Sequence, residues 1–97
     1  YKSLGLLAIL AQGNRERKVA FAHAVIDGLE DLELRRTLEV FLDSNLNLTS
    51  TAKKLHIHRN TVIYRLDQIQ RLIGRDPRVF EQALEIKTAL LIKQLLE

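Results

Sequence analysis

Cysteine and methionine are both absent from the 97 residues, and no long run of apolar residues occurs. Without cysteine the chain can form neither a disulfide nor a thiolate-ligated metal site, which fits a reducing cytoplasm, where we expect the protein to be located. A membrane-spanning helix needs roughly 18 or more apolar residues in succession, so we expect no contact with a membrane. Because the chain begins at Tyr1 and lacks methionine, we also expect it to be a fragment of a longer protein.

The residues that carry catalysis are missing too. The sequence has no cysteine nucleophile, no glycine-rich phosphate loop and no paired carboxylates within an apolar run. His56 and His58 form a His-x-His pair, but no third ligand accompanies them at a recognisable spacing. We therefore expect no enzyme activity, no metal site and no cofactor, and we assign both histidines to turn and cap positions.

The composition, 46% hydrophobic and 28% charged residues, is typical of one globular domain over residues 1–97. Apolar residues recur at three- and four-residue spacing with no strand-like alternation, which predicts an all-α fold of about six helices. Their expected ranges are 3–12, 15–26, 31–44, 48–55, 59–73 and 76–96. The third to fifth should form a trihelical core, with two N-terminal helices and one C-terminal helix packed around it.

Two of the flanking helices carry further expectations. The helix at 15–26 should turn Val19, Ala22, His23 and Ile26 inward, with His23 hydrogen-bonded. Asp76–Pro77 predicts the start of the last helix, because proline at a first helical position loses no hydrogen bond. The apolar surface of that last helix is wider than one packing partner needs, so we expect part of it to be an interface.

A helix-turn-helix is predicted over about residues 48–73. In its first helix Thr49 is the expected N-cap, and Leu48, Ala52 and Leu55 share one side. A short turn, 56–58, must then reverse the chain. His56 is expected at positive φ, Ile57 buried between the helices, and His58 as the N-cap of the second helix.

The second motif helix, 59–73, separates apolar from bonding side chains. Val62, Leu66, Ile69 and Ile73 recur at helical spacing and should pack inward. A helix-turn-helix lays its second helix in the major groove of DNA, where arginine can bind guanine and asparagine can bind adenine. We expect base contacts from His58, Arg59, Asn60 and Tyr64, although the Tyr64 ring could equally pack within the domain. We expect phosphate contacts from Thr49, Ser50, Lys53, Thr61, Arg65 and Arg71.

Charge is distributed unevenly along the chain. The net charge of the whole sequence is only +3, but from Leu46 to Arg75 six cations face one acid, a local charge of +5. From Ala24 to Asn45 two cations face six acids, a local charge of −4. Positive charge therefore collects on the motif, as expected for a surface that binds nucleic acid.

The motif carries a family resemblance. The core HRNT followed by YRL, within the run NLTSTAKKLHIHRNTVIYRLDQIQRLIG, resembles the C-terminal DNA-binding domain of bacterial regulators of the PucR and CdaR type, which control purine catabolism and sugar-diacid use. The flanking segments YKSLGLLAIL, RRTLEVFLDSNLNLT and ALEIKTALLIKQLL also resemble that region, although Leu46 stands where those regulators usually have glycine. The resemblance implies a transcription factor with effector-sensing domains N-terminal to this piece, associated with the nucleoid when bound to DNA.

The expected function is sequence-specific binding of double-stranded DNA. A single motif with about four phosphate contacts would bind weakly, so we expect a homodimer in the full-length protein, with recognition helices about 34 Å apart. Two alternatives remain open: a helical protein-interaction or dimerisation module, and a sequence-tolerant DNA-bending protein.

Overall fold

The computed structural model describes residues 12–96, which form helices joined by short connections and contain no strand. The helices are α2 (Arg15–Ile26), α3 (Leu32–Asp43), α4 (Leu48–Leu55), α5 (Arg59–Ile73) and α6 (Phe80–Leu96). The all-α prediction is confirmed. Residues 3–11 of the helix expected at 3–12 lie outside the described residues. Within residues 12–96 no helix has both the length and the apolar character needed to cross a membrane.

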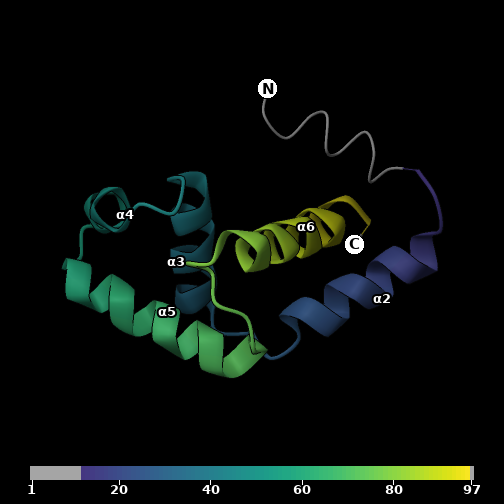
Figure 1. Cartoon of the computed structure of the whole chain (residues 1–97), viewed down its shortest axis with the longest axis horizontal. Coiled ribbons are helices and arrows are strands. Elements are labelled where there is room, and N and C mark those ends of the chain that lie inside the picture. The colour runs from purple at the N-terminus through teal and green to yellow at the C-terminus, as the bar shows by residue number, and fades with distance from the viewer. Residues whose placement is uncertain (1–11, 97) are drawn as a thin grey trace.

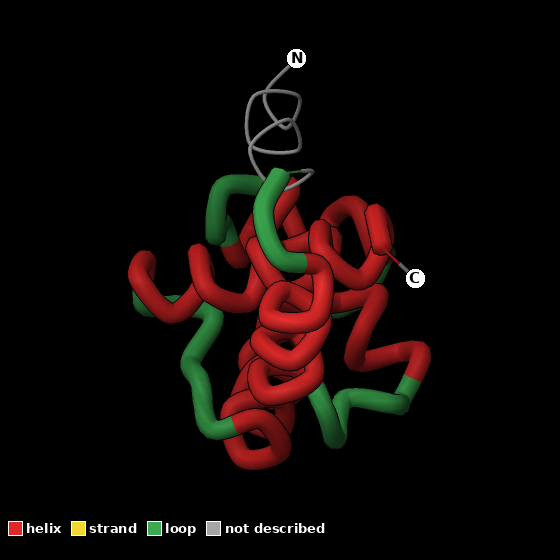
Figure 2. Tube along the Cα trace, turned by 90° about the vertical axis from the view of Figure 1, so that its right-hand side faces the viewer, coloured by secondary structure: helices red, strands yellow, loops and turns green. Residues whose placement is uncertain are grey.

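The predicted trihelical unit consists of α3, α4 and α5, with α3 in contact with both other helices. Figure 1 shows α4 at one end of the molecule and α2 at the other, with α5 running from the α4 end toward α2 and α6 packed on α2. The same arrangement, turned by 90°, is drawn in Figure 2. Leu38, Phe41, Val62, Leu66 and Ile86 are each at most 1% exposed and join the trihelical unit to α6 in one core.

The start of α2 agrees with the prediction, and so does the burial of Ala22 and Ile26, while Val19 is half-buried. The Asn14 carboxamide caps the helix by accepting from the Arg17 amide at 3.0 Å. Ala22, Val25 and Ile26 are the buried residues. The expectation that His23 turns inward is wrong: its side chain is 48% exposed, and its Nδ1 lies 3.2 Å from the Asp27 carboxylate one turn later.

The connection from α3 to α4 uses a pair of left-handed residues, Asn45 (φ 57°) and Leu46 (φ 61°). The Leu46 amide donates to the Phe41 carbonyl at 3.0 Å and the Asn45 amide to the Leu42 carbonyl at 3.2 Å. These bonds form a Schellman motif, which satisfies carbonyls left open at the helix end. Glycine adopts such φ values without steric cost, which gives a physical reason for its usual presence at the Leu46 position.

The N-cap of α4 is Asn47, so the prediction of Thr49 is wrong. The Asn47 carboxamide accepts from the Ser50 amide at 2.9 Å. The left-handed pair ends at Leu46, and the backbone is therefore already helical at Leu48. Thr49 consequently lies inside the first turn and is exposed.

The last helix begins at Phe80, three residues later than the Asp76–Pro77 start that we predicted. Residues 77–79 form a turn instead, closed by the Val79 amide on the Asp76 carbonyl at 3.1 Å. The Asp76 carboxylate accepts from the amide and the Nε of Arg78, so it caps this turn rather than a helix. Pro77 is buried at the bend.

Arg78 connects that turn to the C-terminal half of α5. Its Nη2 lies 2.8 Å from the Asp67 carboxylate and 3.1 Å from the Gln70 carboxamide, while its Nε binds Asp76 at 2.8 Å. Burial raises the pKa of the Asp76 carboxyl, but hydrogen bonds from Arg78 outweigh this and hold that pKa below its ordinary value. We call Arg78 with its partners Asp67, Gln70 and Asp76 the Arg78 clamp. The clamp depends on Asp76 being ionised.

The left-handed conformation at Asn45 predicts which substitutions are tolerated there. Asn45 is exposed, so a change should act mainly through the backbone. We expect Asn45→Val to lower the unfolding free energy by about 1–2 kcal/mol, because a β-branched residue is strained at positive φ. Asn45→Gly should cost less than about 0.5 kcal/mol. Urea unfolding measures both values, and equal stabilities for the two variants would contradict this prediction.

The Arg78 clamp predicts a pH dependence of stability. Because the pKa of Asp76 is lowered in the folded state, its contribution is present above the ordinary carboxyl pKa. That contribution is lost as the pH falls through the folded-state pKa. Asp76→Asn should therefore lower the urea midpoint at pH 7, and the difference from the wild type should shrink in acid. A difference that stays constant down to the acid transition would contradict the role of the ionised carboxylate.

Candidate nucleic-acid interface

The turn between α4 and α5 fixes how the two motif helices cross. His56 has φ 57°, as predicted, and its amide donates to the Lys53 carbonyl at 3.2 Å. The Ile57 amide donates to the Ala52 carbonyl at 3.1 Å, which makes this turn a second Schellman motif. The Ile57 side chain packs against the core but is half-buried, although we expected it to be buried.

His58 caps α5, which confirms that prediction. Its Nδ1 accepts a hydrogen bond from the Asn60 amide at 2.9 Å. A ring nitrogen that accepts carries no proton, so in this neutral ring the proton is on Nε2. His58 is exposed. The cap therefore leaves one N–H donor of the ring without a role in the turn.

The burial of the side chains of α5 agrees with the prediction from their spacing. Val62, Leu66 and Ile69 are fully buried and Ile73 is 8% exposed. Arg59 and Asn60, in the first turn, are exposed, and Tyr64 is 58% exposed. The Tyr64 ring is thus not enclosed by the domain.

The other expected contact residues lie on the same two helices and differ in their exposure and in their side-chain partners. Within residues 12–96 the side chains of Lys53, Lys54, Arg59, Asn60 and Arg71 form no hydrogen bond or ion pair, and all are exposed. Thr49 is exposed, whereas Ser50 and Thr61 are half-buried. Part of the local positive charge is compensated, because Arg75 lies 3.5 Å from the Glu85 carboxylate.

Arg65, which we expected to contact phosphate, has partners within the domain. Its side chain is only 17% exposed, and its Nη2 lies 3.1 Å from the Glu33 carboxylate. Its Nη1 donates to the Thr37 hydroxyl at 3.2 Å. Sequence spacing gave no sign of this link, because Thr37 and Arg65 are 28 residues apart.

The chain is similar to known regulators in sequence. Residues 34–92 match the PucR C-terminal helix-turn-helix domain family. The chain is 39% identical over 67 residues to the purine catabolism regulatory protein of Bacillus subtilis (strain 168), covering 69% of this chain and 13% of that protein. It is 44% identical over 57 residues to the carbohydrate diacid regulator of Escherichia coli (strain K12), covering 59% of this chain and 15% of that protein.

A solved structure agrees with these matches. The regulator of polyketide synthase expression from Bifidobacterium adolescentis superposes with a TM-score of 0.72 at 30% sequence identity, covering 86% of this chain and 35% of that one. All three proteins are much longer than the part they share with this chain. The helix-turn-helix geometry and the family match lead to one conclusion: the chain belongs to the PucR C-terminal helix-turn-helix domain family, a DNA-binding domain of transcription regulators.

Proposed function

We propose that this domain binds double-stranded DNA sequence-specifically, with α5 in the major groove. The observation that carries the proposal is the first turn of α5, where Arg59 and Asn60 are exposed and have no side-chain partner within residues 12–96. Asn60 and Tyr64 lie on the side of α5 away from its buried stripe, whereas Arg59 is exposed at the first position of the helix. Arginine can donate two bonds to guanine and asparagine can pair with adenine, so this turn can distinguish bases.

The surroundings of that turn suit a phosphate backbone. Lys53 on α4 and Arg71 near the end of α5 are exposed, unpaired cations. Thr49, Ser50 and Thr61 add hydroxyl donors on the same helices. The outward Nε2–H of His58 can donate to a phosphate or a base acceptor, and the exposed Tyr64 hydroxyl can do the same.

Two copies are needed for useful affinity. A few phosphate contacts and one recognition helix give weak binding that falls steeply with salt. We therefore propose that the full-length regulator, with effector-sensing domains N-terminal to this one, binds as a homodimer. Its two α5 helices would read half-sites about one helical turn apart.

A second candidate function is contact with another protein. Val79, Phe80 and Leu84, at the start of α6, are 44%, 70% and 48% exposed. Clustered apolar side chains of this kind are typical of protein contacts. They lie on α6 and in the turn before it, not on the motif helices, so such a contact is compatible with DNA binding by α5.

Substitutions on the two motif helices should have different effects. Arg59→Ala should weaken binding to a selected duplex by about 1–3 kcal/mol and relax the preference at one base pair. Lys53→Ala should weaken binding to all duplexes by the same factor. It should also reduce the slope of log-affinity against log-salt concentration by about 0.9. Gel shifts with selected and random duplexes at two salt concentrations measure both effects.

The matched control is Arg17→Ala, which removes one positive charge from α2, at the opposite end of the molecule from α4 (Figure 1). It should leave affinity and salt slope nearly unchanged. If Arg59→Ala and Lys53→Ala also left binding unchanged, the proposed interface would be wrong. Equal affinity of the wild type for unrelated duplexes would instead indicate a sequence-tolerant DNA-bending protein.

The homodimer predicts the form of the binding site. Duplexes selected by the full-length regulator should contain two inverted half-sites with centres about 10 base pairs, or a multiple of that, apart. Sedimentation of the complex should give two protein copies per duplex. Selection of single half-sites, bound by one copy with the same affinity, would contradict the dimer.

A further inference from the structure

The guanidinium of Arg65 joins the recognition helix to α3 by two directional contacts. Its Nη2 lies 3.1 Å from the Glu33 carboxylate, and its Nη1 donates to the Thr37 hydroxyl at 3.2 Å. Thr37 is fully buried, and its hydroxyl donates in turn to the Glu33 carbonyl at 2.9 Å. Of these two acceptors, the Thr37 hydroxyl is itself held in place by α3.

These contacts restrict the rotation of α5 about its own axis, which packing of the apolar core restricts less. Val62, Leu66 and Ile69 hold α5 against the core by burial, which has no preferred direction. Hydrogen bonds weaken steeply with angle, so a fork on two acceptors resists rotation of the helix about its own axis. With a helix radius of about 5–6 Å, a rotation of roughly 20° moves an outer side chain by about 2 Å. A shift of that size would break a bond to a base edge.

The position of Glu33 is unfavourable for DNA binding on charge alone. It places a carboxylate, 70% exposed, beside the recognition helix, where a phosphate backbone would be repelled. A role in orienting Arg65 would explain why an acidic residue stands at this position. By the same geometry, Arg65 is poorly placed as a free phosphate contact, because both of its terminal nitrogens are already engaged.

We propose that Arg65 is a positioning residue, which with Glu33 and Thr37 sets the rotation of α5 about its axis and so determines which base edges Arg59 and Asn60 meet. This inference rests on the proposed function, since it concerns the specificity of the same helix. It differs from a phosphate contact in a measurable way: loss of the link should reduce selectivity between duplexes, not general affinity.

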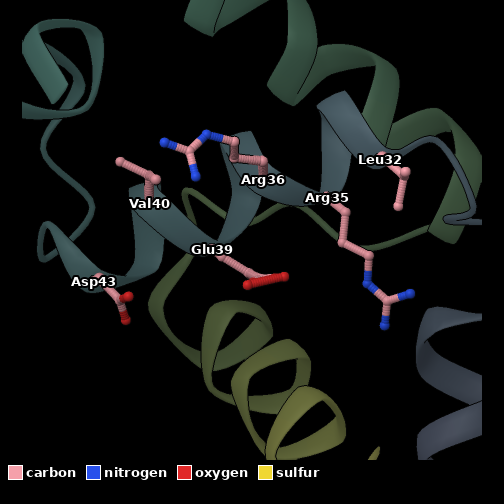
Figure 3. A pocket seen from close by; sticks show the side chains of 6 residues that line it. All are labelled: Leu32, Arg35, Arg36, Glu39, Val40 and Asp43. Atoms are coloured by element: carbon pink, nitrogen blue, oxygen red, sulfur yellow. The ribbon is translucent and has the colours of Figure 1, made fainter. Parts of the chain in front are cut away.

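The sharpest test removes the acid rather than the cation. Glu33→Gln should lower affinity of the full chain for a duplex selected by the wild type, by about two- to fivefold, although the substitution removes a negative charge. Affinity for a random duplex of equal length should stay the same or rise. The matched control is Glu39→Gln on the same helix. Glu39 has no partner among residues 12–96 and lines a shallow pocket on α3 with Arg35, Arg36 and Asp43 (Figure 3).

Variants of the other two residues separate positioning from phosphate binding. Arg65→Gln should reduce selectivity while leaving the log-affinity against log-salt slope unchanged, whereas loss of a phosphate contact would reduce that slope by about 0.9. Arg65→Lys keeps the positive charge but loses the pair of guanidinium nitrogens that bind Glu33 and Thr37. It should therefore reduce selectivity as Arg65→Gln does. Thr37→Val should also reduce selectivity between duplexes. Thr37→Ser keeps the hydroxyl and should retain the selectivity of the wild type. Circular dichroism melts verify that each variant is folded under assay conditions.

Three outcomes would overturn the inference. Equal behaviour of Glu33→Gln and Glu39→Gln would show that the acid has no positioning role. A reduced salt slope in Arg65→Gln, with normal binding by Arg65→Lys, would make Arg65 a phosphate contact. In both of these cases the wild type still prefers its selected duplex, and the proposed function survives. A wild type without any preference would overturn the proposed function itself and this inference with it.

Discussion

The structure depends on the burial of one side of α5. Val62, Leu66 and Ile69 lose all contact with solvent in the core that α3 and α6 share with this helix. Burial of three such side chains stabilises the fold by several kcal/mol, on the order of 1.5–3 kcal/mol each. Because a helix cannot bury all of its sides in so small a domain, the same packing leaves Asn60 and Tyr64 in solvent, and Arg59 is exposed at the first position of the helix. Stability and the candidate interface thus have one origin.

The connections give that packed helix a defined direction. Left-handed residues end α3 at Asn45, α4 at His56 and α5 at Gly74, so each helix stops at a fixed point and the chain turns sharply. Arg65 ties the first half of α5 to α3, and Arg78 ties its second half to the turn before α6. The recognition helix is therefore held along its length, although only its first turn carries the proposed base contacts.

The sequence predicted the features that arise from local chemistry. Periodic apolar residues predicted the buried stripe of α5, and the residue types at His56 and His58 predicted the left-handed end of α4 and the cap of α5. It did not predict features that depend on distant partners. The links from Arg65 to Thr37 and from Arg78 to Asp67 join residues that no helical spacing relates, and the real start of α6 follows from how Asp76 binds Arg78. The contact residues proposed for DNA remain predictions.

One measurement tests the central claim most directly: the change in backbone amide NMR shifts when the full chain binds a selected duplex. If α5 enters the major groove, the largest changes should fall on the first turn of α4 and on residues 58–65, with small changes in α2. Large changes confined to Val79, Phe80 and Leu84 at the start of α6, with residues 58–65 unaffected, would contradict the account.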